Sequence, residues 1–162
     1  MTIELLAIGK TDSKEVAALV EMYARRVNFY CKFSVTTLPD VRNTRKLTPR
    51  QQAAAEGEAI LRQTAEGDFV ALLDERGEEF RSVEFALWLQ KRLNSGPKRL
   101  VLVIGGPYGF SEAVYARAER RIVFPRKPAP SSSGAIPISI RHGSVLKNNK
   151  CVLHQFFILK FG

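Results

Sequence analysis

Short apolar runs alternate with amphipathic stretches over the first 118 residues, and this alternation limits the fold more than any other feature. Each run is rich in Val, Ile, Leu or Phe and is followed by a stretch with helical periodicity or helix-capping residues; the runs are residues 2–8, 33–38, 69–73 and 99–104. A chain that alternates strands and helices in this way forms an α/β domain with a largely parallel sheet. We therefore predict a mostly parallel sheet with flanking helices.

Capping residues indicate where the helices begin. Apolar residues recur at helical spacing over residues 13–28, which predicts an amphipathic helix there. Thr48 is an expected N-cap, because Pro49 follows at the first helical position and Gln51 completes a capping box. Trp88 is expected to pack in the core. Two further N-caps are expected at Ser82 and Ser111.

Length and composition favour one globular domain. The chain has 162 residues, of which 45% are apolar and 25% charged. No apolar run approaches the roughly 18 residues that span a bilayer. The first residues lack the basic region of a signal peptide, so we expect a cytoplasmic protein. The two cysteines and two histidines match no zinc pattern, so no metal is expected.

The net charge of +9 invites a nucleic-acid interpretation, but its distribution weakens that argument. Residues 1–118 hold 17 basic and 15 acidic residues, a net charge of +2. Residues 119–162 hold 8 basic residues and one acid, a net charge of +7. Most of the basic excess therefore lies outside the α/β pattern, and net charge alone is poor evidence for RNA binding.

The apolar run at residues 99–104 leads into Gly105-Gly106-Pro107-Tyr108-Gly109. Glycines at the carboxyl end of a parallel strand let the backbone approach a ligand closely. The segment lacks the Gly-Lys-Ser/Thr of a P-loop and does not match the dinucleotide-binding fingerprint. Two interpretations stay open: a ligand-binding loop, and a tight turn whose glycines need positive φ.

Asp74 follows the apolar run at residues 69–73 and would reach the same sheet edge. It could bind a hydroxyl or an amine there, although a charged residue just past a buried strand is usually solvated. Residues 75–77 are expected to form a turn. With Glu78 and Glu79, this turn would make a solvated acidic rim.

Several segments of the chain resemble one known family in their order and spacing. The family is that of ribosomal RNA large subunit methyltransferase H, among the SPOUT methyltransferases, and the resemblance covers residues 1 to about 118. The Gly-Gly-Pro-x-Gly-hydrophobic-Ser element is its most specific part. The segments are Leu5-Leu6-Ala7-Ile8-Gly9-Lys10, Tyr23 with Arg25-Arg26, Glu56-Gly57-Glu58, Leu72-Leu73-Asp74 with Gly77, and residues 103–111.

The resemblance implies a homodimeric α/β domain with a C-terminal trefoil knot. It also implies transfer of a methyl group from S-adenosyl-L-methionine to N3 of a pseudouridine of the large-subunit ribosomal RNA, within the assembled ribosome. The cofactor residues that it implies are Leu73, Gly105 and Gly106, and no catalytic base is identified. The basic residues that we expect to contact RNA phosphates are Arg25, Arg26, Arg42, Arg45 and Lys46.

The resemblance stops abruptly after about residue 118. Residues 119–162 lack the family's third cofactor loop, its threaded helix and its closing tail, which predicts a divergent segment and a reading-frame slip near codon 119. Two functions stay open: an active methyltransferase, and an impaired remnant with at most weak RNA or cofactor binding. A small nucleotide-binding module is a third interpretation, which the resemblance disfavours.

Overall fold

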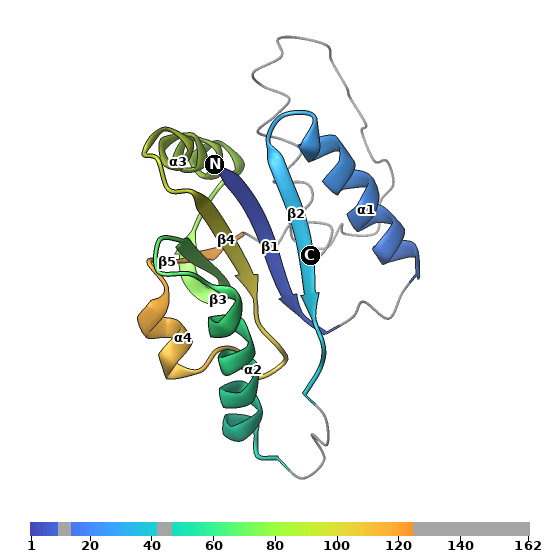
Figure 1. Cartoon of the computed structure of the whole chain (residues 1–162), viewed down its shortest axis with the longest axis vertical. Coiled ribbons are helices and arrows are strands. Elements are labelled where there is room, and N and C mark those ends of the chain that lie inside the picture. The colour runs from blue at the N-terminus through green and yellow to red at the C-terminus, as the bar shows by residue number, and fades with distance from the viewer. Residues whose placement is uncertain (10–13, 42–46, 125–162) are drawn as a thin grey trace, which may run out of the picture.

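The computed structural model describes residues 1–9, 14–41 and 47–124, in which helices alternate with strands as far as residue 123 (Figure 1). The strands are β1 (Thr2–Ile8), β2 (Lys32–Leu38), β3 (Phe69–Glu79), β4 (Arg99–Ile104) and β5 (Arg120–Val123). The helices are α1 (Lys14–Asn28), α2 (Pro49–Gln63), α3 (Ser82–Asn94) and α4 (Glu112–Arg117).

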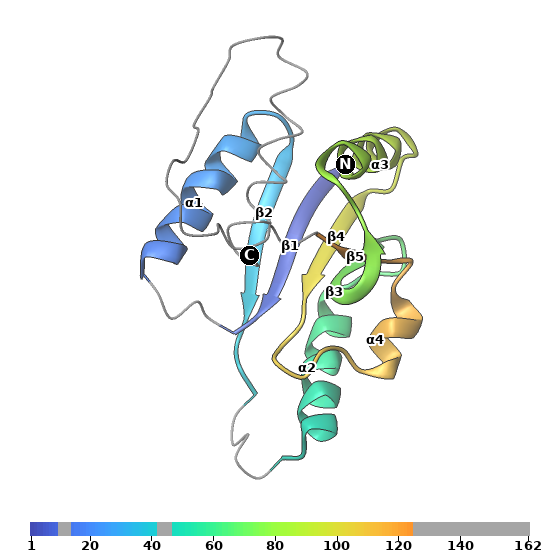
Figure 2. The ribbon, with the colours of Figure 1, turned by 180° about the vertical axis from the view of Figure 1, so that it is seen from behind.

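The strands form one sheet in the order β2-β1-β4-β3-β5, and all of the pairs are parallel. β4 lies between β1 and β3, with Leu102 beside both Leu5 and Ala71. The arrowheads of β1, β2 and β4 point the same way in Figures 1 and 2. The predicted mostly parallel α/β sheet is confirmed.

Alternate residues of the central strands pack on opposite faces of the sheet, as the twofold period of a strand requires. Ile3 and Leu5 belong to a cluster that also contains residues of α1 and α3. Leu6 belongs to a second cluster, which includes residues of α2 and α4. The sheet therefore has helices on both faces, two on each.

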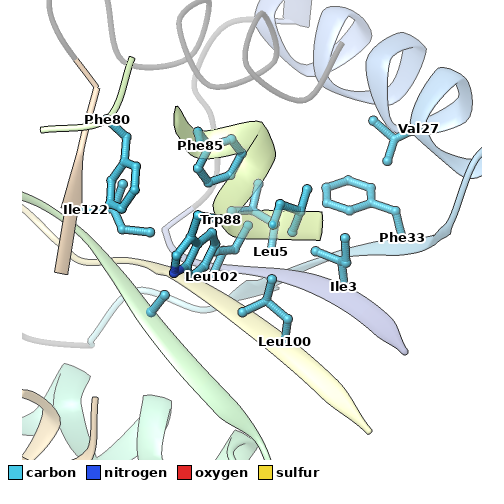
Figure 3. Close-up of a cluster of buried hydrophobic side chains, with 12 residues drawn as sticks. Ile3, Leu5, Val27, Phe33, Phe80, Phe85, Trp88, Leu100, Leu102 and Ile122 are labelled. Carbon is cyan, nitrogen blue, oxygen red and sulfur yellow. The ribbon is translucent and has the colours of Figure 1, made fainter. Parts of the chain in front are cut away.

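Aromatic side chains fill the face beneath α3. Trp88 is 8% exposed and stacks on Phe85, with ring centroids 5.6 Å apart (Figure 3). Phe69 and Phe80 approach the same indole, each at 6.0 Å between centroids. The predicted packing role of Trp88 is confirmed.

The helix N-termini follow the capping pattern with one shift of register. Thr48 caps α2, and the side chain of Gln51 returns a hydrogen bond to the Thr48 amide, as the capping box predicts. Ser111 caps α4, as expected. The N-cap of α3 is Arg81 rather than Ser82. The Arg81 amide donates a hydrogen bond to the Glu84 carboxylate, so Ser82 is the first residue of the helix.

The predicted turn at residues 75–77 is wrong, because this segment remains part of β3. The register with β5 shifts between Leu73 and Glu78, so the intervening residues bulge out of the ladder before pairing resumes. Gly77 permits this return: a Cβ there would lie 2.6 Å from the Ile122 amide nitrogen. Pairing with a strand distant in sequence outweighs the local turn preference.

β5 continues the sheet past residue 118. It pairs with β3, and its Ile122 is fully buried in the cluster beneath α3. Residues 125–162, which hold most of the segment predicted to be divergent and to stand in place of the family's knot region, lie outside the described residues.

Candidate functional site

The ladder between β3 and β4 ends where Leu73 lies opposite Ile104, the last residue of β4, while β3 itself continues to Glu79. Beyond this pair, the chain continues from β3 toward α3 on one face of the sheet and from β4 to α4 on the other. In open α/β sheets, ligands bind outside the carboxyl ends of parallel strands whose chains continue to opposite faces. The structure thus brings Leu73, Gly105 and Gly106 together at one edge of the sheet.

The glycine-rich loop after β4 is confined on more than one side. A Cβ on Gly105 would lie 3.0 Å from the Phe110 ring, and one on Gly106 would lie 2.3 Å from Glu56 Oε2. Gly109 has a φ of 77° and donates from its amide to the Gly106 carbonyl at 3.2 Å. Positive φ explains Gly109, while close approach of neighbouring side chains explains Gly105 and Gly106.

Asp74 lies within β3, one residue past its last pair with β4, and is hydrogen-bonded to α4. Its Oδ2 accepts a hydrogen bond from the Tyr115 hydroxyl at 2.7 Å, and its Oδ1 accepts one from the Arg76 amide at 3.1 Å. Burial, followed by the bond to Asp74, raises the pKa of Tyr115. Asp74 does accept from a hydroxyl, as the sequence allowed, but that hydroxyl belongs to this chain.

The Tyr115 side chain contacts both Asp74 of β3 and Phe110, which follows the glycine-rich loop. Its ring packs edge-on against Phe110 at 5.8 Å, and its hydroxyl lies 3.9 Å from where a Gly109 Cβ would be. The Arg121 guanidinium lies 5.5 Å from the centre of the same ring. Sequence reasoning missed Tyr115, because nothing in its spacing shows that it reaches Asp74, 41 positions away.

Glu56 is a second residue that sequence reasoning did not single out for a role of its own. It lies on α2, is 2% exposed, and its carboxylate faces Gly106. An acidic residue at a buried position of an Ala-rich helix is the signal that could have identified it.

Two of the predicted RNA contacts lie away from the glycine-rich loop. Arg25 and Arg26 occupy the last turn of α1, which precedes the first residue of β2 at the amino edge of the sheet (Figure 1). Arg25 pairs with Glu21, and the Arg26 guanidinium lies 5.7 Å from the centre of the Tyr23 ring. The other three, Arg42, Arg45 and Lys46, lie outside the described residues.

The same amino edge holds a charged cluster around Arg99. Its guanidinium donates to Asp68, to Glu4 at 2.7 Å and to the Gln63 carbonyl at 2.8 Å. The hydrogen bond from Arg99 is the main reason that the pKa of Asp68 is lowered. The cluster ties β1, β4 and the start of β3 together, and therefore has a structural role.

The described part of the chain holds neither a metal-binding cluster nor a helix that could span a membrane. Within residues 1–9, 14–41 and 47–124, no group of three or more His, Cys, Asp or Glu side chains could hold a metal ion. None of the helices in those ranges is both long enough and apolar enough to cross a membrane.

Comparison with known proteins identifies the family. Residues 1–127 match the family described as "Predicted SPOUT methyltransferase". The chain is similar to the ribosomal RNA large subunit methyltransferase H of Christiangramia forsetii, with 52% identity over 75% of this chain and 78% of the relative. The proteins of the same name from Flavobacterium johnsoniae and Porphyromonas gingivalis are 48% and 49% identical, over 75% and 78% of this chain and 78% and 80% of each relative. The chain therefore belongs to the SPOUT methyltransferases, and within them to the family of ribosomal RNA large subunit methyltransferase H.

Proposed function

We propose that this chain transfers a methyl group from S-adenosyl-L-methionine to N3 of a pseudouridine in the large-subunit ribosomal RNA. The observation that carries the proposal is the position of Leu73 of β3 beside the carboxyl end of β4 and its glycine-rich loop, in a chain of this family. The names of the relatives support large-subunit ribosomal RNA as the substrate class.

The loops fit a nucleoside cofactor. Leu73 would offer an apolar surface and backbone groups, while Gly105 and Gly106 let the β4 loop approach closely because neither carries a Cβ. The hydrogen bond from Tyr115 to Asp74 joins α4 to β3 beside the β4 loop. When bound, S-adenosyl-L-methionine supplies a methyl group activated by a sulfonium.

The reaction also needs the pseudouridine N3–H to lose its proton before or during attack on the methyl group. A base or a group that stabilises the resulting anion favours this step. No residue of the chain is assigned that role. What the described residues supply is positioning, and misplacing reacting groups can by itself cost about 10²-fold in rate.

The proposed RNA contacts are basic residues, of which Arg25 and Arg26 lie on α1. Their phosphate contacts would give affinity and orientation rather than sequence specificity. We further propose that the chain acts as a homodimer, in the cytoplasm, on the assembled ribosome. The residues are Arg25, Arg26, Arg42, Arg45 and Lys46.

Residues 119–162 form the second part of the proposed organisation, after a methyltransferase domain over residues 1–118. We propose that this segment is divergent and that a reading-frame slip near codon 119 produced it. The coding DNA tests this directly: another frame downstream of codon 118 should encode the missing family motifs. Absence of those motifs from all frames would make the segment a genuine replacement.

Isothermal titration of the full chain with S-adenosyl-L-methionine tests the function. Binding in the micromolar range supports the enzyme, whereas no binding at about 1 mM cofactor supports the impaired remnant. Gly105→Ala should weaken binding, because the added Cβ would lie 3.0 Å from the Phe110 ring. Gly67→Ala is the matched control, since nothing lies within 4 Å of its added Cβ.

A second titration tests the RNA contacts. The double variant Arg25→Glu, Arg26→Glu should bind large-subunit ribosomal RNA more weakly and with a shallower salt dependence. Arg62→Glu is the control, because the Arg62 side chain is 77% exposed, close to the 75% of Arg25, and lies on α2. Equal losses in both variants would show only a nonspecific charge effect and remove α1 from the proposed interface.

A further inference from the structure

Glu56 is buried beneath the glycine-rich loop without a counter-charge. Only two charged residues of the described chain are classed as buried, Glu56 at 2% exposure and Asp68 at 7%. Asp68 has the Arg99 guanidinium as its partner. In the described residues Glu56 has no ion pair, and the Gln52 side-chain amide donates to its Oε1 at 2.8 Å. A buried carboxylate without a cation is costly, so its presence calls for an explanation.

The second carboxylate oxygen of Glu56 has no hydrogen-bond partner among the described residues. This Oε2 atom is fully enclosed, and it is the atom that a Gly106 Cβ would meet at 2.3 Å. An unpartnered buried acceptor loses its hydration without compensation. The free oxygen is therefore aimed at the loop that the proposed function assigns to the cofactor.

The next residue of α2 holds this arrangement in place. A Cβ on Gly57 would lie 2.2 Å from Ser111 Oγ and 3.2 Å from a methyl carbon of Val114, so α2 packs directly against the start of α4. Two consecutive residues of one helix thus contact both ends of the segment from Gly106 to Ser111. Gly57 thus lets α2 pack close against the segment that Glu56 faces.

We propose that Glu56 is a specificity-determining residue, whose buried negative charge beneath the glycine-rich loop favours a positively charged nucleoside cofactor over its neutral counterpart. The inference rests on the proposed function, since it concerns the same loop. S-adenosyl-L-methionine carries a sulfonium charge that S-adenosylhomocysteine, the product of methyl transfer, lacks. A fixed charge in a poorly solvated site discriminates between such ligands more strongly than one in water.

The charge difference has a functional consequence. Product that binds as tightly as the methyl donor would occupy the site and slow turnover. The Glu56 carboxylate would attract the positively charged methyl donor more strongly than the neutral product. Shape and hydrogen bonds to the adenosine part stay common to both ligands. The two ligands therefore serve as matched probes of one charge.

The experiment titrates full-length wild-type protein, Glu56→Gln and Glu58→Gln with both ligands by isothermal calorimetry. Glu58→Gln is the control, because Glu58 lies two residues along α2 and its side chain is 70% exposed. We expect Glu56→Gln to lower affinity for S-adenosyl-L-methionine about tenfold, or ~1.4 kcal/mol, and affinity for S-adenosylhomocysteine less than about threefold. Glu58→Gln should change neither value.

Two further measurements do not depend on the variant binding ligand. The melting temperature of Glu56→Gln should equal or exceed that of the wild type, because an unpaired buried charge is removed. The wild-type preference for S-adenosyl-L-methionine should persist between about 0.05 M and about 0.5 M NaCl, because salt screens buried charges weakly.

The outcomes separate the possibilities. Equal losses for both ligands in Glu56→Gln would show that the carboxylate only positions the loop, and would overturn the assignment. A lower melting temperature, or a preference that disappears with salt, would overturn it as well. Wild-type protein that binds neither ligand would reject the proposed function and this assignment together, whereas binding without discrimination would reject the assignment alone.

Discussion

The Tyr115→Phe variant isolates the hydrogen bond that joins α4 to β3. It removes a hydroxyl donor 2.7 Å from Asp74 Oδ2 and keeps the ring that packs on Phe110. A hydrogen bond to a charged group contributes about 1.5–3 kcal/mol. Tyr115 and Asp74 are only half-buried, and Asp74 keeps the bond from the Arg76 amide, so we expect a loss of about 1–1.5 kcal/mol.

Thermal unfolding followed by circular dichroism measures this loss. For a chain of this size it corresponds to a melting temperature lower by about 2–5 °C. Tyr108→Phe is the matched control, because Tyr108 lies on the glycine-rich loop after β4 and is 54% exposed. Its hydroxyl has no hydrogen bond among the described residues. A Tyr115→Phe variant as stable as the wild type would refute the reasoning.

The pH dependence of stability tests the same hydrogen bond through ionisation of the Tyr115 hydroxyl. Burial and Asp74 raise the pKa of Tyr115, so the folded chain holds the phenol proton more tightly than the unfolded chain does. The contribution is complete below the pKa of free tyrosine, about 10, and is lost as pH rises through the raised value. The difference between wild type and Tyr115→Phe should therefore be constant near neutrality and shrink in alkali. A difference that persists unchanged in alkali would contradict this.

Three other perturbations have expected outcomes. Arg99→Met should lower the free energy of unfolding by about 3 kcal/mol in urea titrations, because it leaves the buried Asp68 carboxylate without its cation. The lowered pKa of Asp68 means that its contribution is present above about pH 4 and is lost as pH falls through the lowered value, so Asp68→Asn should flatten the acid limb of a stability-against-pH profile. Gly106→Ala should destabilise the fold by about 1–3 kcal/mol, because its Cβ would lie 2.3 Å from Glu56 Oε2; a loss no larger than that of Gly67→Ala would contradict the contact.

The strands were predictable because they are buried on both faces. A strand such as β4 must be apolar along its whole length, and the predicted bounds at residues 2–8 and 99–104 agree with β1 and β4. Thr48 was equally predictable, since a capping box depends on neighbours only three positions apart. Local signals determine these elements, and no knowledge of the tertiary structure is needed.

Long-range pairing decided what the local sequence left open. Gly77 suggested a turn, yet β3 continues because β5 supplies a partner strand. The glycines after β4 had two interpretations, a ligand-binding loop and a tight turn with positive φ. Gly109 takes a positive φ, while Gly106 makes room for the Glu56 side chain. The continuation of β3 and the close contact at Gly106 both depend on residues far away in the sequence.

The sequence by itself determined the α/β class, the positions of β1, β2 and β4, and the family to which the chain belongs. These follow from periodicity, caps and motif spacing, which are properties of neighbouring residues. Only the tertiary structure decided that Tyr115 bridges to Asp74 and that Glu56 lies uncompensated beneath Gly106. Such contacts depend on how the helices pack on the sheet, and the spacing of residues in the sequence does not show that geometry.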